Sequence, residues 1–159
     1  MSYMRKKILM IVIVILLLVA YYLISPLFIV KEVNDELPMI NYAMDSLGNM
    51  NIQPVNELLS SNLVASAHDV SGRVAVYDNI GQRTLRFENL NTVNGPDLFI
   101  YLATDTTAKD FVNLGEVKAT KGNVNYDIPI GLDLEKYDTV LIWCRAFRTL
   151  FSYAELNKK

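Results

Sequence analysis

The side chain with the widest chemical repertoire in this sequence is Cys144, the only cysteine among 159 residues. A thiol can be oxidised, and once it has lost its proton it can ligate a metal or attack a disulfide. A single cysteine excludes a disulfide within the chain and any zinc site built from several cysteines. Two interpretations remain open: Cys144 is a redox-capable group, or it is a small apolar side chain that packs in a core.

The residues that follow Cys144 bear on its reactivity. Arg145 and Arg148 are cations, and a nearby cation lowers the pKa of a thiol. A regular strand would turn Arg145 away from Cys144, because successive side chains alternate between the two faces. We expect Cys144 to lie at the end of a strand beside a bend, where its sulfur would be partly accessible.

The only histidine, His68, is the second residue that could join this chemistry. It is a candidate ligand or proton partner for Cys144, or it hydrogen-bonds the start of the first strand of the domain. A Cys-His or Ser-His-Asp hydrolase would have to use His68 as its base, and no signal for a substrate pocket accompanies it. One histidine also excludes a paired-His zinc motif, and no glycine-rich nucleotide motif occurs. The sequence therefore predicts no metal site.

Residues 139–156 must position Cys144, and their composition predicts two strands. The stretch is rich in β-branched and aromatic residues and bends tightly at residues 145–146. The first strand has two apolar faces, which consist of Val140, Ile142 and Cys144 on one side and Leu141 and Trp143 on the other. Apolar residues on both faces indicate a central strand. Trp143 and Tyr101 could stack on a planar cofactor, although aromatic residues on central strands more often belong to the core.

Other short strands are predicted between turn signals from residue 68 onward. They are a hairpin of residues 73–78 and 82–88, a central strand at 98–103, and a hairpin of 112–118 and 123–128 around Lys121 and Gly122. About seven or eight short strands in all predict an all-β fold, an antiparallel β-sandwich or barrel-like domain over residues 68–159.

The N-terminal part of the chain predicts a membrane anchor. Residues 8–30 carry no charge and would span roughly 34 Å as a helix, which matches the core of a lipid bilayer. Pro26 would kink or end this helix. A cleaved signal peptide usually has a shorter apolar core of about 7–15 residues and a small-x-small site, for which this segment is a poor match. The basic tail, residues 1–7, places the N-terminus in the cytoplasm of a single-pass membrane protein and the domain outside it.

Residues 31–67 read as a juxtamembrane linker with two short helices. Apolar residues recur at helical spacing over residues 37–47, and a second helical segment is predicted at 55–63. Met39, Met44 and Met50 are either a soft-metal site for copper or a flexible apolar stripe that lies on the membrane or on the domain.

Charge excludes one class of partner. Residues 8–159 carry 12 of the 15 basic side chains and all 17 acidic ones, which leaves a net charge of −5. An acidic domain without a basic stripe argues against binding to nucleic acid.

Several short motifs in order resemble the DM-thirteen domain, which accompanies DOMON domains in animals and occurs alone in microbes. The matching positions, which span about residues 68–156, are His68, Ser71, Gly72, Asn94, Gly95, Pro96, Asp97, Leu98, Tyr101, Leu102, Asn113, Leu114, Gly115, Gly122, Tyr126, Ile128, Pro129, Val140, Ile142, Trp143, Cys144, Phe147, Phe151 and Ala154. The resemblance implies a β-rich extracellular domain with an electron-transfer role. It places the family cysteine at Cys144, as a bare thiol or as a ligand to a prosthetic group such as haem.

Two hypotheses about function follow. In the first, the chain is a membrane-anchored electron-transfer module that acts through Cys144 and exchanges electrons with a separate, unknown redox partner protein. In the second, it is a non-catalytic binding or structural module at the cell surface, and Cys144 is core packing. Neither hypothesis requires a stand-alone enzyme.

Overall fold

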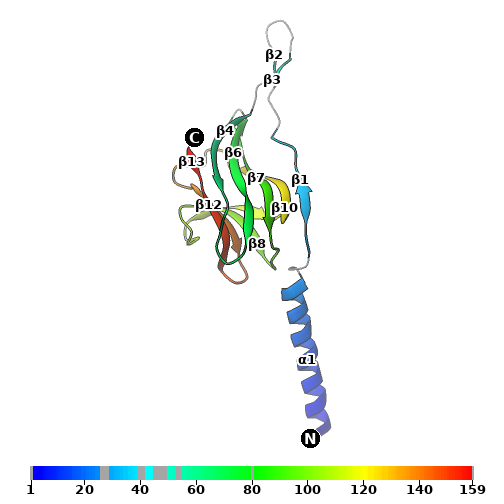
Figure 1. Ribbon diagram of the computed structural model, residues 1–159. Coiled ribbons are helices and arrows are strands. Elements are labelled where there is room, and N and C mark those ends of the chain that lie inside the picture. The colour runs from blue at the N-terminus through cyan, green and yellow to red at the C-terminus, as the bar shows by residue number, and fades with distance from the viewer. Residues whose placement is uncertain are drawn as a thin grey trace.

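The computed structural model describes residues 2–25, 29–38, 42–44, 50–52, 55–79 and 81–158, which form one N-terminal helix and a β domain (Figure 1). The helix α1 spans Ser2–Ile24, and in the described chain it is the helix that is long and apolar enough to cross a bilayer, a property that a signal sequence shares. It starts and ends earlier than the predicted span of residues 8–30: Ile29 and Val30 lie outside any helix. Pro26 falls outside the described residues.

The larger of the two sheets of the domain has six strands. Their spatial order is β1 (Glu32–Asn34), β10 (Lys121–Ile128), β7 (Gln82–Thr92), β6 (Val70–Asn79), β4 (Asn56–Asn62) and β13 (Asn157–Lys158). All neighbours are antiparallel except β1 and β10, which are parallel. The predicted hairpin of residues 73–78 and 82–88 is confirmed as β6 and β7.

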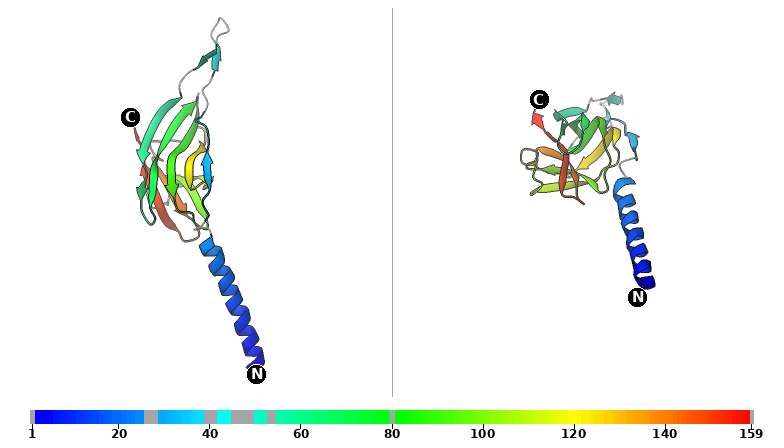
Figure 2. Two further views of the ribbon diagram at one scale, coloured as in Figure 1. Left: turned by 45° about the vertical axis from the view of Figure 1, so that its right-hand side comes forward. Right: turned by 60° about the horizontal axis from the view of Figure 1, so that its bottom comes forward.

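The second sheet has five antiparallel strands and faces the first (Figure 2). Its order is β5 (Val64–Ala65), β12 (Thr149–Glu155), β11 (Thr139–Cys144), β8 (Leu98–Ala103) and β9 (Phe111–Glu116). A separate hairpin of β2 (Tyr42–Met44) and β3 (Met50–Ile52) projects away from both sheets. The all-β antiparallel sandwich is therefore confirmed, with more strands than the seven or eight predicted.

The core lies between the inward faces of the two sheets. Strand β11 is central and Val140, Ile142 and Cys144 share one face, as predicted, and the structure turns this face into the main apolar cluster. Leu141 and Trp143 belong to a smaller cluster on the outer face of the same sheet. The two faces separate because side chains alternate along a strand. This alternation is the reason that the sequence predicted which residues share a face with Cys144.

The predicted hairpin of residues 112–118 and 123–128 is wrong. Strand β9 pairs with β8 in one sheet, and β10 pairs with β7 and β1 in the other. Gly122 does have a positive φ, of 105°, but it serves another purpose than a turn. A Cβ atom there would collide with the Val33 carbonyl oxygen, so glycine allows β1 to lie against β10.

The predicted helices of the linker are also wrong where the structure describes them. Residues 56–62 form β4, which pairs with β6 and buries Leu59 in the core. Long-range pairing overrides a weak helical pattern in so short a segment. Strands β1, β4 and β5 all precede residue 68, so the domain begins earlier than expected. Most of 37–47, and the side chains of the three methionines proposed for copper, lie outside the described residues.

Candidate functional site

The chain reverses direction directly after Cys144, at one end of the sandwich. Residues 145–148 form a four-residue turn, in which the Arg148 backbone N–H donates to the Arg145 carbonyl oxygen (3.4 Å). The Thr149 hydroxyl donates to the Phe147 carbonyl oxygen (3.0 Å). The bend was expected at residues 145–146 with Phe147 already in the second strand. Instead Phe147 stands at the turn and is 58% exposed, because β12 begins only at Thr149.

The loop of residues 94–97 closes this end of the sandwich. The Asn94 side-chain oxygen accepts a hydrogen bond from the Gly95 N–H (2.9 Å). A Cβ atom at Gly95 would lie 3.0 Å from the Phe151 ring and 3.1 Å from a Leu98 methyl carbon. Such contacts are tighter than normal packing allows, so glycine lets the loop settle directly on Phe151 and Leu98.

An ion pair fastens this loop to the turn. The Arg145 guanidinium donates to both Asp97 carboxylate oxygens (3.0 and 3.1 Å), and the Arg145 N–H donates to the Asp97 carbonyl oxygen (2.9 Å). The hydrogen bonds to Asp97 raise the pKa of the Arg145 guanidinium above its ordinary value. The guanidinium also lies 4.2 Å from the centre of the Phe99 ring. We call residues 94–97 and 145–148 together the latch.

Cys144 lies beneath the latch with 0% of its surface exposed. Its register partners are Leu98 on β8 and Thr149 on β12. The expectation that a strand end would leave the sulfur partly accessible is wrong. A bulge explains the closure: Ile142 pairs with Ser152 and the next residue, Trp143, with Leu150, so Phe151 is an extra residue on β12. The Phe151 side chain joins the buried cluster that contains Cys144.

The structure places His68 on the outer side of Phe151. The two rings are in contact, with their centroids 4.0 Å apart and their planes tilted by 38°, and the His68 backbone N–H donates to the Phe151 carbonyl oxygen (3.3 Å). Ser66 donates to the same carbonyl, so this segment runs along β12 towards the turn. The structure thus brings His68 to the end of the sandwich that holds Cys144. A role as ligand or proton partner of the thiol stays a prediction.

Sequence reasoning missed Ser152, a polar side chain inside the core. Ser152 is 0% exposed, and its hydroxyl has no hydrogen-bond partner among the described residues. It pairs with Ile142 and therefore shares the inward face of the sheet with Cys144, on the neighbouring strand. A buried hydroxyl without a partner costs free energy and calls for an explanation. Ser152 lies three residues from Thr149, the β12 partner of Cys144, and this relation could be recognised only with the register known.

The residues around Cys144 do not fit a haem ligand in this conformation. The sulfur is fully buried, and its inward neighbours are apolar side chains of the core. A hollow of about 250 Å³ adjoins the latch, lined by residues 94–98 with Tyr22, Lys31, Glu116 and Val117, but Cys144 is not part of its lining. Pockets for cofactor-sized ligands are larger, about 300–1,000 Å³. We therefore derive no chemistry through haem.

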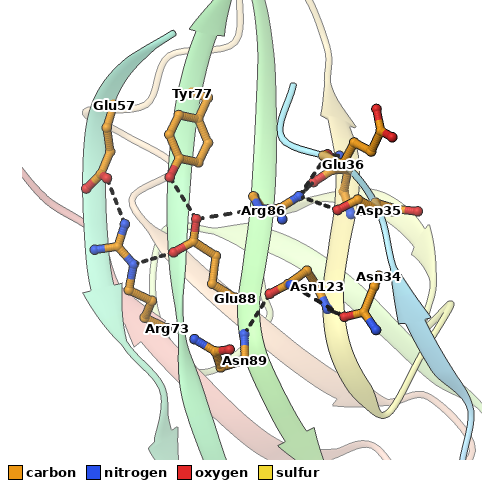
Figure 3. Close-up of polar contacts among 11 residues, drawn as sticks. Asn34, Asp35, Glu36, Glu57, Arg73, Tyr77, Arg86, Glu88, Asn89 and Asn123 are labelled. Carbon is orange, nitrogen blue, oxygen red and sulfur yellow. Dashed lines mark hydrogen bonds and ion pairs between the residues drawn. The ribbon is translucent and has the colours of Figure 1, made fainter. Parts of the chain in front are cut away.

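A second polar cluster lies on the outer face of the six-stranded sheet (Figure 3). The Arg73 guanidinium donates to Glu57 and Glu88 (2.7 Å each), and the Tyr77 hydroxyl donates to Glu88 (2.7 Å). The bond to Glu88, followed by that to Glu57, raises the pKa of Arg73 above its ordinary value. Burial is the main reason that the pKa of Tyr77 rises to about 12. These groups satisfy one another across three strands, so the cluster is a scaffold.

Arg86 extends this cluster to the segment that follows β1. Its guanidinium donates to the carbonyl oxygens of Asp35 (3.0 Å) and Glu36 (2.9 Å) and to the side chain of Asn125 (2.8 Å). Arg86 therefore holds the first residues after β1 against the sheet. Within the described residues, no group of three or more His, Cys, Asp or Glu side chains is arranged to hold a metal ion.

Together, the fold and the site define an antiparallel β-sandwich domain, preceded by an apolar helix, with one thiol sealed at the end of a central strand. Residues 62–156 match the family model described as electron transfer DM13, and the chain therefore belongs to this family. No curated protein and no solved structure matched the chain.

Proposed function

We propose that this protein is a membrane-anchored electron-transfer module and that Cys144 is its redox-capable group. In this proposal α1 stays in the membrane, the basic residues 5–7 keep the N-terminus in the cytoplasm, and the sandwich lies outside the cytoplasm. Membership of the electron transfer DM13 family supports the electron-transfer role. A separate redox partner protein would supply or accept the electrons.

The observation that carries this proposal is that several family positions gather at the end of the sandwich that holds Cys144. His68 contacts Phe151, Phe151 and Leu98 contact the Gly95 position, and Leu98 pairs with Cys144. These residues lie far apart in the sequence and share little except this end of the sandwich. The unpartnered hydroxyl of Ser152 on the same inward face adds a polar group that a purely apolar core would not need.

The latch offers a route by which a buried thiol becomes reachable. Its ion pair is exposed: the side chains of Arg145 and Asp97 are 58% and 27% accessible. An ion pair so exposed contributes little to stability. Local openings of a turn cost much less free energy than global unfolding. Separation of the turn from the loop would uncover Cys144 while the two sheets stay intact.

The burial of Cys144 favours a second candidate function. A thiol with 0% exposure among Leu98, Ile142 and Phe151 also fits a passive role as a core residue. The protein would then be a non-catalytic binding or structural module tethered to the cell surface.

Thiol reactivity in the full chain, purified in detergent, tests the two functions against each other. Cys144 would be reacted with a soluble aromatic disulfide, so that its thiolate attacks one sulfur and releases one equivalent of coloured thiolate. The electron-transfer proposal expects the folded protein to react much faster than it unfolds globally. Asp97→Asn, which loosens the latch, should speed the reaction roughly three-fold, a modest change because the ion pair that it removes is exposed.

Asp133→Asn is the matched control, because Asp133 is a carboxylate at the start of a distant loop that caps its own backbone (2.9 Å to the Glu135 N–H). This change should leave the reaction rate as it was. If Cys144 in the wild-type protein reacts only at the rate of global unfolding, and Asp97→Asn changes nothing, the thiol is not a working group. The passive module would then be the function.

A further inference from the structure

We propose that the turn of residues 145–148 rests on the lipid headgroups of the membrane that holds α1. This inference rests on the proposed membrane anchor and adds a contact that the anchor alone does not require. The partner is the bilayer surface itself, bound by one exposed aromatic side chain with cations on both sides. The argument combines the placement of the turn with its chemistry.

The turn and the C-terminal end of α1 lie at the same end of the domain. In Figures 1 and 2 the hairpin of β11 and β12 points towards the helix, and its tip lies level with the helix end in each view. The hollow beside the latch is lined both by Tyr22 of α1 and by residues 94–98. A helix α1 that crosses the bilayer therefore places the latch, including its turn, at the membrane surface.

Hydrogen bonds hold the chain after the helix to this same end. The Asn94 side-chain N–H donates to the Ile29 carbonyl oxygen (3.3 Å), and the Thr120 N–H donates to the Lys31 carbonyl oxygen (2.8 Å). The Lys31 N–H donates to the Thr120 hydroxyl oxygen (3.1 Å). These bonds begin a few residues after α1, so little chain is left to lift the domain away from the membrane. An extended chain covers at most about 3.6 Å per residue.

The turn has the composition of a membrane-interface contact. Phe147 is 58% exposed at its tip, between Arg145 and Arg148, and all three side chains face solvent. Aromatic side chains favour the headgroup level of a bilayer, and arginines there meet lipid phosphates. Val30 and Val93, which flank the hydrogen-bonded segments at this end, are also exposed, at 70% and 38%. Water is a poor environment for these apolar groups, and a bilayer surface would cover them.

Charge supports the same orientation. Residues 8–159 carry a net charge of −5, whereas the turn carries no acidic residue and two arginines, of which Arg145 is paired with Asp97. Lipid phosphates would repel the rest of an acidic domain, and they would accept hydrogen bonds from Arg148. The turn is thus the part of the domain best suited to lie on phosphate headgroups.

Quenching by brominated lipids tests the contact in the full chain reconstituted in vesicles. Trp143, the only native tryptophan, would be replaced by phenylalanine, and a single reporter would be introduced as Phe147→Trp. Ile130→Trp in the same background is the matched control, because Ile130 is 83% exposed and follows the end of β10, away from the Lys31 end of that strand. Circular dichroism would show that each variant folds, and flotation after alkaline extraction would show that α1 is in the bilayer.

We expect roughly two-fold quenching of the Phe147→Trp protein by lipids brominated near the headgroup, and little quenching of the Ile130→Trp protein. Equal quenching of the two, or quenching of neither in protein that floats with the vesicles, would overturn the lipid contact and leave the anchor in place. Protein that does not float after alkaline extraction would refute the anchor and the contact together.

Discussion

The polarity of the surroundings of the Cys144 sulfur distinguishes two explanations for its burial: a passive core residue and a redox-capable group. The thiol side chain is small and weakly polar, so it tolerates an apolar core at little cost. A hydroxyl in its place would demand a hydrogen bond. Ser152 is already such a hydroxyl, one strand away, and has no partner among the described residues. Substitutions at position 144 therefore report on the polarity of this pocket.

We predict that Cys144→Ser destabilises the protein more than Cys144→Ala does. Serine would bury an unpaired hydroxyl, at a cost of about 1–3 kcal/mol. Alanine would leave only a small cavity, at a cost of about 1 kcal/mol. Denaturant unfolding of the full chain in detergent, followed by circular dichroism, measures both free energies.

The Ser152→Ala variant is the companion to this pair. When Ser152→Ala is combined with Cys144→Ser, it should cause no further loss of unfolding free energy if the two side chains do not interact. A Cys144→Ser protein as stable as the alanine variant would mean that the new hydroxyl pairs with Ser152. In that case the cavity around the sulfur is more polar than its apolar neighbours indicate.

At the scale of elements, three contacts join parts that the chain keeps apart. The latch joins the β11–β12 turn to the loop before β8, β1 pairs with β10, and Arg86 on β7 holds the segment after β1. Each of these contacts connects the end of the sandwich near the helix to a central strand. These contacts thus connect the segment after the helix, the latch and the core.

We predict that Arg86→Met releases the segment of residues 35–36 and costs about 3 kcal/mol, because it removes one partner of a buried charge. The Arg86 side chain is 6% exposed and lies 3.5 Å from Glu88, which is 18% exposed. Amide hydrogen exchange provides the local measurement. The Asp35 N–H, which donates to the Asn123 carbonyl oxygen (2.9 Å), should lose its protection.

Arg83→Met is the control for this change on the same strand. The Arg83 guanidinium donates to the Leu132 carbonyl oxygen (3.1 Å), and Arg83 lies at the opposite end of β7 from the helix. It should leave exchange at Asp35 unchanged. Normal protection at Asp35 in the Arg86→Met protein would mean that β1 pairing and the hydrogen bonds from Asn125 to Asp35 and Glu36 (2.8 Å each) hold the segment.

At the scale of the whole molecule, the helix, the thiol and the exposed turn all gather at one end. A partner that reaches Cys144 through the latch would then approach along the bilayer surface. The opposite end carries the loop of residues 129–138 and a hollow of about 460 Å³ that is lined partly by Leu132 and Leu134. The two ends of the domain thus differ because the anchor joins it at one of them.

Global unfolding should depend on pH in the alkaline range. Burial raises the pKa of Tyr126 from about 10 to about 12, and the side chain is only 2% exposed. The folded protein therefore keeps the phenolic proton between about pH 10 and pH 12, where the unfolded chain releases it. The free energy of unfolding should be insensitive to this group below about pH 10 and should fall by at most about 2–3 kcal/mol towards pH 12.

Denaturant unfolding at a series of pH values from about 9 to 12 measures this slope. Tyr126→Phe should lower stability by about 1 kcal/mol at neutral pH, because it removes the hydrogen bond from the Lys118 N–H (2.9 Å). It should also flatten the alkaline slope. A slope that is unchanged in this variant would assign the alkaline loss to other groups, of which Tyr77 is the first candidate.

The sequence alone determined the parts of this protein that depend on local pattern. The uncharged apolar run predicted a helix of bilayer length, alternation along residues 139–144 predicted which residues share a face with Cys144, and short motifs predicted the family. These features follow from side-chain period and turn chemistry, which a few neighbouring residues specify.

Only the tertiary structure decided which strands pair and what covers the thiol. Residues 56–62 form strand β4 because they pair with β6. Strands β9 and β10 lie in different sheets because β9 pairs with β8 and β10 pairs with β7. Cys144 is buried in a core cluster that includes Phe151, and the loop that closes this end of the sandwich packs on Phe151 through Gly95, which lies 49 positions from Cys144 in the chain. Contacts over such separations depend on the closure of the whole sandwich, and no local period encodes them.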